Sequence, residues 1–135
     1  MIVDTGVLVA AANRSDPNGP SCQQLLRSAQ GPLVVPPLVI AEAGFLIERD
    51  LGSAAEVLFL RSLAHPRFRI ETVRPDDLRR MAELVDQYGD LPLGTTDASV
   101  IALAERLGER EVATLDRRHF TVVRPNHVDA LTPLP

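Results

Sequence analysis

Short apolar runs alternate with amphipathic segments along most of the chain. Four runs are short, rich in β-branched residues or alternating, and bounded by turn formers, which predicts strands at residues 1–4, 31–37, 67–73 and 111–116. Residues 120–123 predict a fifth, short strand. Between these runs apolar residues recur every three or four positions, which is typical of helices. The helices are expected at residues 7–12, 21–29, 38–49, 53–64, 75–88 and 97–107.

Turn formers separate these elements and indicate the fold class. Prolines, glycines and other turn formers predict loops at residues 13–20 and 89–96, and Thr96 is expected to cap the helix that follows. Strands that alternate with helices predict an α/β fold with a central, mainly parallel sheet. The proline-containing residues 125–135 are expected to form a short, loosely attached tail, and residues 1–135 a single domain.

Composition narrows the classes of function. The chain has 135 residues, of which 45% are hydrophobic, enough for one core. The net charge of −4 argues against binding nucleic acid by bulk attraction, although a local basic strip remains compatible with it. All fourteen cationic residues are arginines, so chemistry that needs a lysine is excluded. The single cysteine, Cys22, and the lack of a secretory signal or a membrane-spanning run predict a cytoplasmic protein with no membrane partner.

Four carboxylates break the apolar pattern: Asp4, Glu42, Asp97 and Asp116. Asp4 and Asp116 each end a predicted strand, and Asp97 lies in the first turn of a helix. Glu42 is spaced three and four residues from apolar neighbours, so we expect it on the apolar stripe of its helix. The carboxyl ends of parallel strands and the adjacent helix N-termini form the usual ligand crevice of such sheets. The four acids are therefore expected to converge at one sheet edge.

Clustered carboxylates repel one another unless cations hold them together, and oxygen-rich sites select Mg²⁺ or Mn²⁺. The residues alone leave a plainer interpretation of each acid open. Asp4 and Asp116 suit helix caps, Asp97 complements a helix dipole, and Glu42 could pair with an arginine.

Other α/β chemistries lack their residues in this chain. The glycine-rich motifs of P-loop and dinucleotide-binding proteins are absent. A receiver domain needs a lysine, and a haloacid-dehalogenase-type phosphatase needs an acid where Gly6 stands. The spacings of His65, His119 and His127 match no metal or acid–base pattern, so we expect surface or capping roles for them.

Four stretches match one family in order and spacing: MIVDTGVLVA (1–10), VIAEAGFLI (39–47), LGTTDASVIALAERLG (93–108) and ATLDRRHFTVVRP (113–125). On these stretches the chain resembles the PIN-domain proteins, specifically the VapC-type toxins of type II toxin–antitoxin systems. The resemblance implies a three-layer α/β/α sandwich and a Mg²⁺- or Mn²⁺-dependent endoribonuclease. It places the four acids on the catalytic quartet and gives Thr5 and Thr96 supporting roles. The metal ligands are expected to be chiefly Asp4 and Asp97, with Asp116 binding directly or through water.

The resemblance also implies partners. VapC-type toxins cleave tRNA or ribosomal RNA, usually form homodimers, and are held inactive by a VapB-type antitoxin. Arg117 and Arg118 directly follow Asp116, so we expect them to bind substrate phosphates. Residues 57–60 are all apolar. We expect half of them to pack in the core and the rest to form a protein-binding groove. Two alternatives stay open: a catalytically silent PIN-like module that binds proteins, and a DNA-directed flap nuclease of the same superfamily.

Overall fold

A computed structural model describes all residues, 1–135. Five strands form one sheet in the order β3-β2-β1-β4-β5, and every neighbouring pair is parallel. The strands are β1 (Ile2–Val3), β2 (Leu33–Val35), β3 (Phe68–Ile70), β4 (Glu111–Ala113) and β5 (Thr132–Leu134). The predicted α/β class with a mainly parallel sheet is therefore confirmed, and the sheet is parallel throughout.

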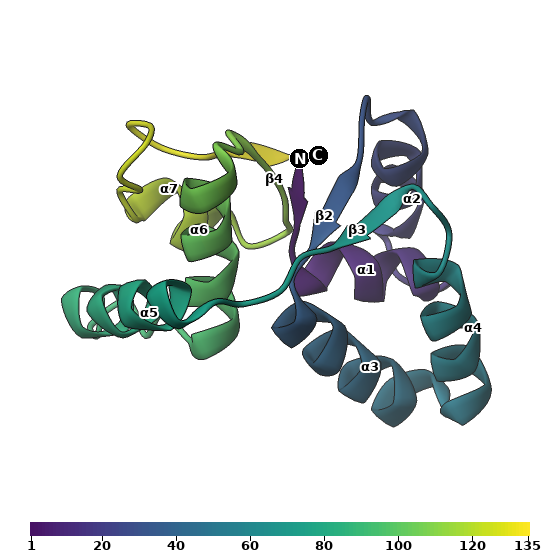
Figure 1. Ribbon diagram of the computed structural model, residues 1–135. Coiled ribbons are helices and arrows are strands. Elements are labelled where there is room, and N and C mark those ends of the chain that lie inside the picture. Colours follow the sequence, from purple (N-terminus) through teal and green to yellow (C-terminus); the bar gives the residue numbers. More distant parts are fainter.

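Seven helices connect and cover the strands (Figure 1). They are α1 (Thr5–Ala12), α2 (Gly19–Ser28), α3 (Pro37–Leu51), α4 (Ser53–Leu63), α5 (Pro75–Gln87), α6 (Thr95–Leu107) and α7 (Arg117–Val122). In Figure 1, α1 to α4 lie on one side of the strands, and α5 to α7 lie on the other. This arrangement is the three-layer α/β/α sandwich.

The central position of β1 follows from its sequence. Ile2 and Val3 are fully buried, as strands covered by helices on both faces require. Ile2 pairs with Val34 on one side and with Val112 on the other. The ladder to β4 continues one residue further, because the backbone N–H of Asp4 donates to the carbonyl of Ala113 at 2.9 Å.

The helix ends match the sequence signals in part. α5 begins at Pro75, as predicted, and α6 ends at Leu107, directly before Gly108, whose left-handed φ of 70° suits a glycine. The prediction that Thr96 caps α6 is wrong, because the helix begins at Thr95 and Gly94 occupies the N-cap position. α1 begins at Thr5, two residues earlier than predicted.

Two predictions near the C-terminus are also wrong. Residues 120–123 do not form a strand; their first three residues end α7, whose apolar Phe120 and neighbouring Val123 lie three apart and are both buried. The expected loose tail contains β5, which pairs with β4. Pro133 lies within β5, and an edge strand tolerates proline because one row of its N–H groups has no partner to lose.

An ion-pair cluster ties α6 to the start of α5. The guanidinium of Arg106, in the last turn of α6, lies 2.9 Å from Asp77 and 3.0 Å from Glu71, and it also donates to the carbonyl of Thr72 at 2.8 Å. Asp77 in turn accepts from the backbone N–H of Arg74 at 2.8 Å. These contacts fix the end of α6 opposite to Asp97, so they hold the helix that carries that acid.

No helix combines the length and the apolarity that crossing a membrane would require.

The packing of the C-terminal residues can be tested with Leu131, which is only 4% exposed. We expect Leu131→Ala to lower the free energy of unfolding by about 2–3 kcal/mol, because it removes buried methyl groups and leaves a cavity. Urea denaturation measures the loss. Leu78→Ala, at a 55% exposed position, serves as the control and should change stability by less than about 0.5 kcal/mol. Equal effects of both substitutions would show that these residues are a loose tail after all.

Candidate active site

The strand order places a cleft beside the carboxyl ends of β1 and β4. The chain progresses from β1 through β2 to β3 on one side of β1, and then crosses to β4 on the other side. Such a switch point leaves a crevice where parallel α/β sheets bind their ligands. An open cleft lies there, lined by Asp4, Thr5, Gly6, Glu42, Leu46, Asp97, Leu115, Asp116, Arg117 and Arg118. It contains all four predicted acids, while Thr96 is not among its residues.

Asp4 is the most buried of the four acids, at 5% exposed. It occupies the N-cap position of α1, yet its side chain makes no capping hydrogen bond. Instead, Oδ2 accepts a hydrogen bond of 2.7 Å from the hydroxyl of Thr114. Burial raises the pKa of Asp4 to about 6, the hydrogen bonds from Thr114 and from the backbone of Thr5 oppose this, and the charges of Asp97 and Glu42 add to it.

Glu42 reaches the cleft from a different face of α3 than the sequence predicts. The buried stripe of that helix is Val39, Ala43 and Ile47, and Glu42 is exposed beside it. The expectation that Glu42 lies on the apolar stripe is therefore wrong. Its Oε2 accepts a 2.6 Å hydrogen bond from the hydroxyl of Thr5, which holds the carboxylate at the cleft.

Asp97 and Asp116 share one partner, the imidazole of His119. Its Nδ1 lies 3.1 Å from Oδ2 of Asp97 and 2.7 Å from Oδ2 of Asp116. Asp116 also caps α7, because its Oδ1 accepts from the backbone N–H of His119 at 3.1 Å. Burial raises the pKa of Asp97, and the charge of His119 opposes this shift. The capping interpretation of Asp116 thus holds together with its place in the cluster.

His119 is a member of the cluster that the sequence reasoning missed. Its Nε2 lies 3.0 Å from the carbonyl oxygen of Leu91, which can only accept, while Nδ1 faces two carboxylates. Both ring nitrogens therefore face oxygen acceptors, and Nδ1 is buried without a hydrogen bond of good geometry. The signal was the spacing of three residues from Asp116, which places two side chains together only on a helix. With residues 120–123 predicted as a strand, the spacing gives no reason to expect contact between His119 and Asp116.

Thr114 is the second residue that sequence reasoning missed. It follows β4, is 1% exposed, and bonds to both Asp4 and the backbone of Asp116. A polar residue at the buried end of an apolar strand, two residues before an acid, was the available signal.

The two predicted phosphate-binding arginines differ in their surroundings. Both line the cleft. The guanidinium of Arg117 donates to a backbone oxygen of Pro135, directly after β5, whereas Arg118 is exposed and makes no ion pair. Arg118 is therefore the cation at this cleft that remains available to a ligand.

The charge balance of the cleft suits a metal ion. Four carboxylates line it, and the one basic side chain in contact with any of them is the imidazole of His119. Oxygen ligands at this density suit Mg²⁺ or Mn²⁺. In the structure no three of these side chains converge on a common ion position, and the imidazole lies between Asp97 and Asp116. Because its donors are carboxylate oxygens, the cleft still fits a hard divalent cation by its chemistry. Such an ion would replace His119 as the partner of Asp97 and Asp116.

The buried charge of Asp4 predicts a pH dependence in chelator. Its pKa of about 6 exceeds the ordinary 3.8, so the folded protein binds this proton more tightly than the unfolded chain does. Below about pH 4 this tighter proton binding contributes about 3 kcal/mol to the free energy of unfolding. The contribution is lost as the pH rises through 6. Asp4→Asn lacks that charge, so at pH 7.5 in EDTA we expect it to be more stable than the parent.

Urea denaturation of both proteins from pH 4.5 to 7.5 measures this effect. The stability difference between Asp4→Asn and the parent should widen with pH, because only the parent acquires the buried charge. A difference that stays constant over this range would contradict the prediction.

Comparison with known proteins identifies the family and the fold. Residues 1–124 match the model of the PIN domain family. Ribonuclease VapC26 of Mycobacterium tuberculosis is 34% identical over 125 residues, which cover 93% of each chain. The crystal structure of M. tuberculosis VapC20, described as a sarcin-ricin loop cleaving toxin, superposes with a TM-score of 0.82 at 21% identity, covering 87% of this chain and 91% of that one.

The VapC20 structure shares the fold, and the family match spans all four acids of the cleft. The chain belongs to the PIN domain family.

Proposed function

We propose that this protein is a divalent-metal-dependent endoribonuclease and the toxin of a type II toxin–antitoxin pair. The observation that carries the proposal is the gathering of four carboxylates, two of them in contact with one histidine, in an open cleft at the switch point of the sheet. Membership of the PIN domain family and the 34% identical relative named a ribonuclease support it.

Asp4, Asp97 and Asp116 would hold Mg²⁺ or Mn²⁺, because they are the acids that the sheet edge and the start of α6 place at the cleft. A bound divalent ion supplies Lewis-acid activation of the phosphodiester and of the attacking water. Glu42, which Thr5 orients at 2.6 Å, would accept the proton of that water. Attack on phosphorus with release of the 3′ oxygen leaves a 5′-phosphate and a 3′-hydroxyl.

The substrate would meet the cleft through its phosphates. An acidic cleft repels RNA, so its attraction depends on the metal and on the free guanidinium of Arg118. The open shape of the cleft suits a backbone that passes across it. We infer that the substrate is tRNA or ribosomal RNA, for which the description of VapC20 offers support by analogy.

Loss of the acids tests the proposed chemistry. We expect Asp97→Asn to lower RNA cleavage at least about 100-fold and to abolish growth inhibition on expression, because it removes a metal ligand. EDTA should abolish cleavage by the parent, and Mn²⁺ or Mg²⁺ should restore it. Asp90→Asn is the matched control, since Asp90 is an exposed loop acid outside the cleft.

Full cleavage by Asp97→Asn would refute the assignment of the acids. A parent that binds no Mn²⁺ at millimolar concentration and cleaves no RNA, yet still binds a protein partner, would favour the catalytically silent module.

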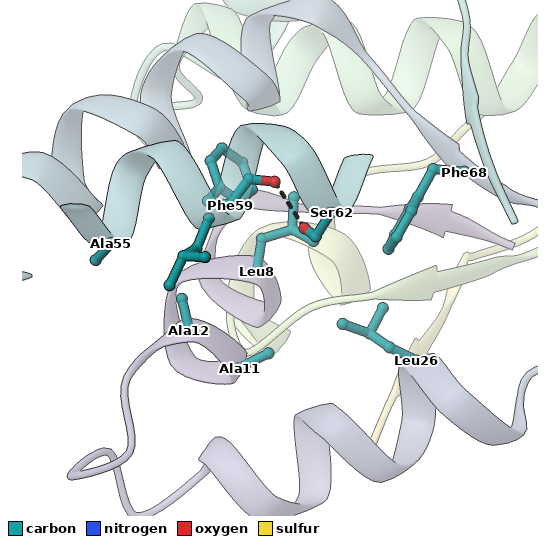
Figure 2. A pocket seen from close by; sticks show the side chains of 9 residues that line it. Leu8, Ala11, Ala12, Leu26, Ala55, Phe59, Ser62 and Phe68 are labelled. Carbon is teal, nitrogen blue, oxygen red and sulfur yellow. Dashed lines mark hydrogen bonds between the residues drawn. The ribbon is translucent and has the colours of Figure 1, made fainter. Parts of the chain in front are cut away.

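A second surface supports the antitoxin partner. An apolar groove lies between α1, α2 and α4 (Figure 2). It is lined by Leu8, Ala11, Ala12, Leu26, Ala55, Leu58, Phe59, Ser62 and Phe68. The hydroxyl of Ser62, its one polar side chain, donates to the carbonyl of Phe59 at 2.6 Å, so it seeks no outside partner. Such a groove suits the apolar face of an amphipathic helix.

The apolar run 57–60 contributes to this surface. Phe59 is buried, whereas Val57, Leu58 and Leu60 are 44%, 67% and 49% exposed. The run therefore divides between core and surface. We infer that a VapB-type antitoxin covers this groove, and the net charge of −4 suits a basic partner.

Leu58→Glu tests the groove. We expect it to weaken binding of the cognate VapB-type antitoxin at least about 10-fold, because a charge would be buried in an apolar contact, while RNA cleavage is retained. Titration calorimetry measures the affinity. Leu78→Glu, on α5 at a similar exposure and on the other side of the molecule in Figure 1, is the control. Equal affinities of both variants and the parent would exclude this groove.

A homodimer and a cytoplasmic location complete the proposal. Phe45 of α3 is 63% exposed and available to a second copy, and Cys22 is a free, buried thiol that fits a reducing compartment.

A further inference from the structure

Thr114 joins two of the acids through one hydroxyl group. Its Oγ1 lies 2.7 Å from Oδ2 of Asp4 and 2.9 Å from the backbone nitrogen of Asp116. The side chain is 1% exposed, so no solvent competes for these contacts. The backbone is fixed as well, because the N–H of Thr114 donates to the carbonyl of Leu134 in β5 at 2.8 Å.

The direction of both hydrogen bonds follows from the groups involved. The backbone N–H of Asp116 can only donate, so the Thr114 hydroxyl accepts from it. The single hydroxyl proton is then left for Asp4, whose ionised carboxylate can only accept. One oxygen of Asp4 is thereby held by Thr114, which follows β4, while the residue lines the cleft.

The Thr114 side chain that makes these two hydrogen bonds is also rigid. Threonine is branched at Cβ, which restricts its χ1 angle, and the side chain is almost completely buried. On the other side of Asp4, Thr5 directs its own hydroxyl to Glu42, not to Asp4. Thr114 is therefore the one side chain that donates a hydrogen bond to Asp4.

We propose that Thr114 is a positioning residue, which sets the Asp4 carboxylate and the Asp116 backbone in the one relation that lets both acids bind the same divalent ion. It acts through the acids and touches neither metal nor RNA. This inference rests on the proposed function of the cleft. Groups that orient metal ligands in this way typically contribute 10–100-fold to metal affinity.

Two substitutions separate the hydroxyl from the shape of the side chain. Thr114→Val keeps the shape and loses the hydroxyl, whereas Thr114→Ser keeps the hydroxyl and loses the methyl group. Ser99→Ala is the control, because it removes an equally buried hydroxyl that donates only to the carbonyl of Thr96. Mn²⁺ affinity in the absence of RNA, followed by electron paramagnetic resonance of the free ion, is the first readout.

We expect Thr114→Val to weaken Mn²⁺ binding about 10–100-fold, and Thr114→Ser and Ser99→Ala to stay within about 3-fold of the parent. The second readout is RNA cleavage against Mn²⁺ concentration. There Thr114→Val should shift the half-saturating concentration upward by a similar factor. Thermal melts in EDTA show that the variants are folded. If Thr114→Val does not fold, Thr114→Cys, which retains only a weak donor, takes its place with the same expectation.

Unchanged Mn²⁺ affinity in the folded valine or cysteine variant would overturn the role of Thr114. Equal losses in the valine and serine variants would overturn it too, because the hydroxyl would then not be the cause. Both results differ from failure of the proposed function, in which the parent itself binds no Mn²⁺.

Discussion

The parallel pairing of β1 with β4 is the contact on which the rest of the structure depends. These strands lie far apart in the sequence, and their ladder runs from Ile2–Val112 to the hydrogen bond between Asp4 and Ala113. It closes the two halves of the sheet and creates the switch point between them. Because both strands run in the same direction, their carboxyl ends meet, and Asp4 and Asp116 are placed at one cleft.

The cleft gathers negatively charged side chains, and one of them is buried. Asp4 is almost fully buried, and burial raises its pKa to about 6. His119, Thr114 and Thr5 each satisfy part of the cluster, and the Arg106 cluster secures α6 from its far end. Sites that bind cations commonly carry such a cost in the metal-free state, since the arrangement that suits the ion strains the protein alone. The metal binding that we propose for Asp4 would thus oppose the stability of the metal-free protein.

Much of the architecture could be predicted because its signals are local. The buried strands, the start of α5 at Pro75 and the end of α6 before Gly108 depend on a few adjacent residues. The errors arose where two local interpretations were equally good. Residues 120–123 have the composition of a strand, but α7 forms because Asp116 caps it and Phe120 and Val123 both reach the core. Pro133 suggests a tail, yet an edge strand accepts it.

The sequence by itself determined which acids break the apolar pattern and which strand ends and helix starts carry them. These are properties of single segments, and polar residues in apolar surroundings are conspicuous at that level. Only the tertiary structure decided which face of α3 presents Glu42, that His119 lies between two carboxylates, and that Thr114 bonds to Asp4 across 110 residues. Each of these depends on the packing of distant segments, because a hydroxyl or an imidazole acquires its partners only when the strands and helices assemble.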